Sequence, residues 1–123
     1  MRATVLLLLL VMLVPCRAQD KGEPISVHVK EVQRVQDEDA TEKGNWFHIT
    51  AVVETKTVIY LLKCDEYYSS EKHGFAASCF HLSAGKDYSG KRFPTSIGFW
   101  RPEDKGSGAT LIMYEIVSEK EKQ

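Results

Sequence analysis

The sequence predicts an all-β protein, a small antiparallel sandwich or barrel of about six strands with one disulfide. Short segments rich in apolar and β-branched residues alternate with turns rich in glycine or charged residues, and no segment has a convincing helical period. Two cysteines remain after a predicted signal peptide is removed. Consecutive strands joined by turns of this kind pair in antiparallel fashion, which favours a sandwich or a small barrel.

The first predicted strand lies in residues 25–35, where the pattern leaves two alternatives. Ile25, Val27 and Val29 alternate with polar residues, as in a strand with one buried side. Val32 and Val35 then fall three residues apart, which also suits one face of a helix. We favour the strand because β-branched residues are poor helix formers.

The remaining strands follow from alternation or from continuous apolar runs. Residues 47–53 alternate with a period of two, and a charged loop precedes them at 36–45. Residues 58–62 are continuously apolar, as in a central strand covered on both faces. Three further strands are predicted at 75–83, 96–100 and 109–117, and the connections between strands fall at 65–74, 84–94 and 103–108.

The first eighteen residues have the pattern of a secretory signal peptide. A single Arg2 precedes the apolar run 3–14, and the segment ends in Cys16-Arg17-Ala18 with small residues at the two positions that signal peptidase reads. The run is shorter than the ~20 residues that span a bilayer, so no membrane span is expected. We therefore expect residues 19–123 to form a single secreted, extracellular β domain.

The cysteines predict one disulfide. Cys16 belongs to the predicted signal peptide, which leaves Cys64 and Cys79 as an even pair in an oxidising compartment. Their bond closes a loop of 16 residues. In the chain-entropy model such a loop stabilises the fold by about 3 kcal/mol.

The charge pattern argues against nucleic acid as a partner. The whole chain has 16 basic and 17 acidic residues, and the predicted signal peptide contains two of the basic ones, so the remaining domain has a formal net charge of −3. Its lysines and arginines are scattered, with no cluster denser than Lys91-Arg92. A nucleic-acid binder would have a basic patch or stripe.

The sequence contains no motif for catalysis. Gly-x-Ser-x-Gly is absent, and both cysteines of the domain are expected to be oxidised. Asp65 and Glu66 are adjacent carboxylates that would point to opposite faces of a strand, and a solvated loop explains them better. We expect no enzyme, no catalytic residue and no cofactor.

The four histidines do not have the spacing of a metal site. His28, His48, His73 and His81 form none of the close pairs that bind zinc. Three of them, all except His73, lie on the less apolar sides of predicted strands. Ordinary cross-strand pairing is favoured there over metal binding, so no metal ligand is predicted.

The aromatic residues provide the candidate site. Seven of them lie at predicted strand ends and in loops, where they would form one contact surface: Trp46, Tyr67, Tyr68, Phe75, Phe93, Phe99 and Trp100. Exposed tyrosine and tryptophan are enriched in protein interfaces. The competing interpretation is that these rings cap the open ends of a barrel. The set leads us to expect a non-enzymatic extracellular binding protein that recognises another macromolecule, most simply an extracellular protein.

Two short motifs give the alternative function. Gly44-Asn45-Trp46 opens a predicted strand, and Asp87-Tyr88 follows about forty residues later. The pair resembles the Gly-x-Trp and Thr-Asp-Tyr signatures of lipocalins, secreted barrels that carry small apolar molecules. Residue 86 is lysine rather than threonine, a strand is predicted before the first motif, and the domain is short for eight strands. The resemblance implies a small carrier of apolar ligands.

The predicted processing can be tested by intact mass. We expect the secreted protein to begin at Gln19 and to weigh as 105 residues less two hydrogens, with a further loss of ammonia if Gln19 cyclises. Labelling by a thiol reagent without prior reduction would contradict the expected cysteine pairing.

Overall fold

The computed structural model describes residues 21–37, 41–101 and 110–123. The predicted signal peptide, residues 1–18, lies outside these ranges. The described chain is all-β, with seven antiparallel strands and one disulfide, which confirms the predicted fold class. The strands are β1 (Glu23–Gln36), β2 (Gly44–Glu54), β3 (Val58–Ser69), β4 (Gly74–Ala77), β5 (Asp87–Arg92), β6 (Ser96–Phe99) and β7 (Ile112–Glu121).

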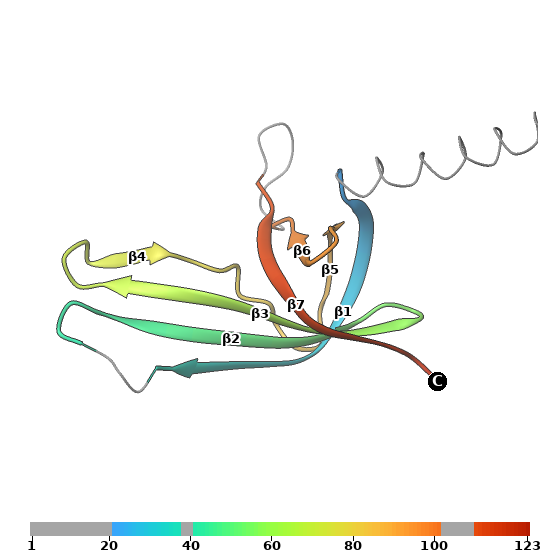
Figure 1. The fold of residues 1–123 in the computed structure, drawn as a ribbon, viewed down its shortest axis with the longest axis horizontal. Helices are drawn as coiled ribbons and strands as arrows, with labels where there is room; N and C mark the ends of the chain where they lie inside the picture. Colours follow the sequence, from blue (N-terminus) through green and yellow to red (C-terminus); the bar gives the residue numbers. More distant parts are fainter. Residues whose placement is uncertain (1–20, 38–40, 102–109) are drawn as a thin grey trace, which may run out of the picture.

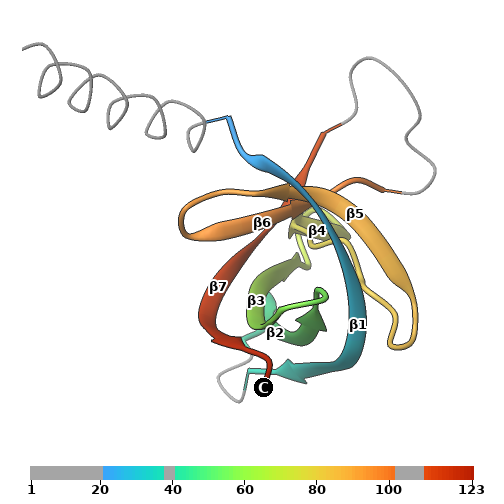
Figure 2. The same ribbon diagram turned by 90° about the vertical axis from the view of Figure 1, so that its right-hand side faces the viewer.

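Six of the strands close into a ring. The hydrogen-bonded order is β2-β1-β5-β6-β7-β3, and the additional pairing of β2 with β3 joins its ends. Figure 2 looks into this ring, which we call the barrel. The seventh strand, β4, lies outside the ring and pairs with β3.

Three long strands continue beyond the barrel into a flat extension. The first half of β1 pairs with β5 and its second half with β2, while β3 pairs with β7 only up to Lys63. Beyond these points the strands pair only with one another and with β4. The resulting four-stranded sheet comprises residues 31–36, 44–50, 64–69 and 74–77, and we call it the arm (Figure 1).

The structure settles the alternatives for residues 25–35 and corrects three other predicted elements. Residues 25–35 lie within a single strand, β1. Strand β3 continues to Ser69 through the first half of the predicted loop 65–74. Strand β5 occupies the predicted connection 84–94, and residues 78–83 of the predicted strand 75–83 have no regular structure. The sequence of β5, DYSGKR, has one large apolar residue, so it offered no periodic signal.

Aromatic side chains occupy the interior of the barrel. Tyr88, Phe99 and Tyr114 are buried and contact one another edge to face, with ring centroids 6.4 Å and 5.7 Å apart in the two successive pairs. Phe80 extends this row against Tyr88 at 5.5 Å. Buried aliphatic residues pack around the row, among them Val27, Val29, Leu62 and Ile97. Edge-to-face contacts between aromatic rings stabilise the fold by more than the burial of their apolar area alone.

A glycine allows β5 and β6 to approach each other closely. A Cβ atom built on Gly90 would lie 1.8 Å from the carbonyl oxygen of Gly98, which is backbone and has little freedom to move. In contrast, a Cβ atom on Gly74 would meet only the carbonyl oxygen of Lys72, at 3.8 Å. A side chain at position 90 would therefore force the backbones of β5 and β6 apart.

This contrast gives a matched pair of variants. We expect Gly90→Ala to lower the free energy of unfolding by about 2 kcal/mol or more, because it forces the two backbones apart. Gly74→Ala should change it by less than about 0.5 kcal/mol. Urea denaturation of both variants measures the difference, and equal stabilities would contradict the close approach.

Candidate binding surface

The two faces of the arm present different side chains because residues alternate along each strand. On β2, Ile49, Ala51 and Val53 point into the barrel and are buried, so Phe47 lies on the same side. We call this side the inner face. Trp46 and His48 lie on the opposite side, the outer face. The direct cross-strand pairs extend each face onto β1 and β3.

The outer face exposes a tryptophan beside a tyrosine. Trp46 is paired with Tyr67 across β2 and β3, and their ring centroids are 5.0 Å apart. Trp46 is 45% exposed. Val35, on the neighbouring β1, is 58% exposed and pairs with His48 on the same face. This face thus presents exposed apolar groups near the end of the arm.

The inner face presents a second aromatic cluster. Phe75, on β4, contacts Tyr68 at 5.5 Å and Phe47 at 6.3 Å between ring centroids. Phe75 is 45% exposed, whereas Phe47 and Tyr68 are half-buried. Four of the seven aromatic residues singled out in the sequence, Trp46, Tyr67, Tyr68 and Phe75, therefore lie together on the arm, divided between its two faces.

The other three aromatic residues lie on the barrel. Phe99 is fully buried in the core, so it is not part of any surface. Phe93 follows β5 and is half-buried beside Tyr60 and Arg92. Trp100 follows β6, is half-buried, and donates its backbone N–H to the carbonyl of Ser89. The structure therefore does not bring these residues together with the aromatic residues of the arm.

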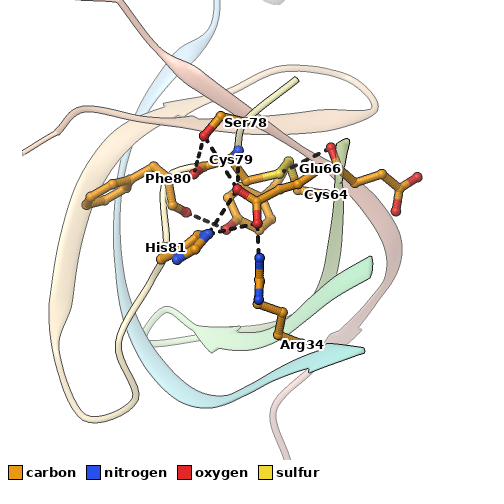
Figure 3. Close-up of polar contacts among 9 residues, drawn as sticks. Arg34, Cys64, Glu66, Ser78, Cys79, Phe80 and His81 are labelled. Carbon is orange, nitrogen blue, oxygen red and sulfur yellow. Dashed lines mark hydrogen bonds and ion pairs between the residues drawn. A yellow bond between two sulfur atoms is a disulfide. The ribbon is translucent and has the colours of Figure 1, made fainter. Parts of the chain in front are cut away.

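A buried carboxylate lies where the arm joins the barrel. Glu66 is 1% exposed and accepts hydrogen bonds from groups on two separate segments (Figure 3). Arg34 Nε on β1 lies 3.3 Å from it, and His81 Nε2 lies 2.8 Å and 2.9 Å from its two oxygens. The backbone N–H of Cys79 donates at 3.0 Å and the Ser78 hydroxyl at 3.4 Å. We call this group the Glu66 cluster.

The cluster keeps Glu66 ionised in spite of its burial. Burial alone raises the pKa of its carboxyl, but the hydrogen bonds from His81, Cys79 and Arg34 outweigh this effect and hold the pKa below its usual value. The sequence-based assignment of Glu66 to a solvated loop is therefore wrong. The missed signal was alternation, because Tyr60, Leu62 and Glu66 are all buried on the same side of β3.

The disulfide fastens the same junction. Cys64 on β3 is bonded to Cys79, as the cysteine count predicted. Cys79 and Leu82 are buried in the core, so the segment 78–83 packs against the barrel interior. The hydroxyl of Tyr114 donates to the carbonyl of Phe80 and fixes this segment further. The arm is thus joined to the barrel by continuous strands, by a covalent bond and by the Glu66 cluster.

The structure places three of the histidines at separate sites, each with carboxylate partners. His28 bonds Asp87 at 2.7 Å, His81 belongs to the Glu66 cluster, and His48 bonds Asp65 at 2.8 Å. The fourth, His73, is exposed and lies in the turn before β4 with a positive φ of 50°. Across residues 21–37, 41–101 and 110–123, no group of three potential ligands could hold a metal ion.

The pKa of His48 is raised above 6.5 by its hydrogen bond to Asp65, with Asp37 contributing on the other ring nitrogen. The ion pairs of the protonated ring are thus fully present below pH 6.5. They are lost as the pH rises through the higher pKa of the folded protein.

A scan against protein-family models and searches of curated proteins and of solved structures found no match to this chain. In the described ranges there is also no helix of the length and apolar character needed to cross a membrane.

The Glu66 cluster gives a prediction for stability. We expect Glu66→Gln to lower the free energy of unfolding by about 3 kcal/mol at neutral pH, because it removes the charge that Arg34 and His81 face. The pKa of Glu66 is lowered in the folded state, so its contribution is present above the ordinary value near 4.5 and is lost as the pH falls through the folded value. The difference between variant and wild type should therefore shrink in acid. Glu115→Gln, at an exposed position on β7, is the control.

Urea denaturation at several pH values measures this difference. An equal effect of Glu66→Gln at every pH, or no larger effect than that of Glu115→Gln, would contradict the role assigned to the cluster.

Proposed function

We propose that this protein is a secreted, non-enzymatic binding protein that recognises an extracellular protein through the aromatic surface of the arm. The observation that carries the proposal is the exposure of Trp46 and Phe75 on opposite faces of one sheet, each beside at least one more aromatic ring. Aromatic residues of this kind are the anchors that dominate the energetics of protein interfaces. Singly scattered exposed apolar residues would need no such explanation.

The support of the arm favours a role in recognition. A rigid surface loses little conformational entropy when it binds, so more of the contact energy appears as affinity. Three features make the base of the arm rigid: the strands that it shares with the barrel, the Cys64–Cys79 disulfide and the Glu66 cluster. A β arm braced in this way is suited to holding its aromatic groups in one arrangement before a partner arrives.

A carrier of small apolar molecules is supported less well. The closed ring of strands is the one observation in its favour, since carriers of this kind enclose their ligand in a barrel. Here the interior holds Tyr88, Phe99 and Tyr114, packed edge to face. Trp46 of the Gly-x-Trp motif lies on the arm, and Tyr88 of the second motif is part of the core.

Substitutions on the arm test the proposal. We expect the double variant Trp46→Ala/Phe75→Ala to lose binding to an extracellular protein partner by at least about tenfold while its stability changes by about 1 kcal/mol. Trp100→Ala, which removes a half-buried indole from the barrel, should leave binding unchanged. Binding is measured by capture from the source fluid followed by titration of the captured protein. Equal retention of partner by both variants would contradict the role of the arm.

A parallel measurement addresses the carrier. Native mass spectrometry should show no co-purifying small apolar molecule, and titration with a fluorescent fatty-acid analogue should leave the tryptophan emission without saturable quenching. A one-to-one quenching curve that a competing apolar ligand abolishes would support the carrier instead.

A further inference from the structure

The second half of β1 is an unpaired edge of the arm. Residues 31–36 pair in unbroken register with β2 on one side, while the pairing of β1 with β5 ends at His28. On the other side of residues 31–36, the described part of the chain contributes no strand. In Figure 1 this half of β1 forms the lower margin of the arm. Six extended residues expose about 20 Å of edge backbone.

The opposite edge of the arm is less suited to accept another strand. Strand β4 has only four residues, and its register with β3 shifts between Tyr67 and Tyr68, so the strand is irregular at Ala76. Short and bulged strands are the means by which proteins block unwanted pairing at an edge. Neither feature occurs between residues 31 and 36 of β1, so this is the edge on which a further strand could be added in register.

Arg34 gives the β1 edge a specific chemistry. Its Nε bonds the buried Glu66, and its guanidinium carbon lies 4.0 Å from the centre of the Phe47 ring. These two contacts orient the guanidinium plane. Its two terminal nitrogens have no partner among the described residues, and the side chain is 39% exposed. An arginine held in this way presents donors in the fork geometry that a carboxylate accepts.

The neighbours of Arg34 restrict the occupant further. Val32 and Gln36 lie two residues away on the same inner face, and both are uncharged. A second copy of the chain fits poorly, because two-fold pairing about Gln33 or Arg34 makes the two Arg34 guanidinium groups diagonal or direct neighbours. A strand from another protein with an acidic residue facing Arg34 has no such repulsion.

We propose that the β1 edge accepts an extended segment of the partner protein, added antiparallel or parallel to residues 31–36, with an Asp or Glu side chain bound by Arg34. Main-chain hydrogen bonds supply affinity in this mode of recognition, and the side chain at alternate positions supplies specificity. This inference rests on the proposed function, since it specifies how the partner is held. It adds a main-chain and charge component to the aromatic contacts of the arm.

A peptide series on the wild-type protein tests the edge directly. The probe is the acetylated and amidated peptide TVTETVT, whose glutamate and valines share one face of a strand, with the glutamine and lysine analogues TVTQTVT and TVTKTVT as controls. We expect binding with a dissociation constant of about 1 mM or below, with NMR shift changes centred on residues 31–36. The glutamine peptide should bind at least about fivefold more weakly and the lysine peptide more weakly still. Only every second N–H of the bound peptide points towards β1. N-methylation of that set of alternate amides should abolish binding, whereas N-methylation of the other set should not.

Variants separate the charge from the fold. Arg34→Gln should remove the preference for the glutamate peptide, whereas Lys63→Gln, at an exposed position on the outer face of β3, should leave it unchanged. Arg34 also supports Glu66, so Arg34→Gln could fail to fold. In that case the comparison of the glutamate, glutamine and lysine peptides on the wild-type protein tests the charge preference by itself. Equal binding of the glutamate and lysine peptides, shift changes away from the β1 edge, or no binding at about 1 mM would overturn the inference.

The two proposals fail in different ways. If Trp46→Ala/Phe75→Ala loses the natural partner while Arg34→Gln retains it, the aromatic surface stands and the edge inference is wrong. If the glutamate peptide binds the β1 edge but the aromatic double variant retains the partner fully, the edge inference stands and the role proposed for the aromatic surface is wrong.

Discussion

The pairing of Glu66 with Arg34 and His81 is the interaction on which the junction of arm and barrel depends. It joins a residue of β3 to the second half of β1 and to the irregular segment that follows β4. A carboxylate so deeply buried is tolerated only when its partners satisfy it. Here its partners are two basic side chains, a backbone N–H and the hydroxyl of Ser78. The same pairing also orients the Arg34 side chain, which is partly exposed. The need to satisfy the buried carboxylate of Glu66 therefore fixes the position of a basic group at the surface.

The sequence predicted the fold class because this depends on short-range patterns. Alternation along β2 and the apolar run in β3 are local signals, and the disulfide followed from a count of cysteines. In contrast, β5 was missed because its pairing with β1 and β6 supplies the structure that its own sequence, with a single large apolar residue, does not specify. The closure of the ring through β2 and β3 likewise depends on register over long distances, which no local pattern contains.

The candidate surface was predicted in part, for a similar reason. Tyr67, Tyr68 and Phe75 were singled out because they lie in or at the end of a predicted loop, and the structure places them with Trp46 on the arm. Phe99 was misplaced because its position at the end of a short strand suggested exposure, although Ile97 and Phe99 alternate as core residues do. Arg34 had no signal at all, since its importance comes from Glu66 and Phe47, which lie on other strands.

Strand β1 pairs with two other strands, β2 and β5, and this has a consequence for how the chain folds. Its pairing with β2 joins neighbours in sequence and can form early as a hairpin, whereas its contact with β5 joins residues such as His28 and Asp87, 59 positions apart. Contacts at such separation cost loop entropy and slow the folding reaction. Cys64 and Cys79 both lie in the chain between His28 and Asp87, and their bond connects two points that are 15 residues apart in sequence. Early oxidation would thus shorten the loop that ring closure must span, so the disulfide acts on the folding rate as well as on stability.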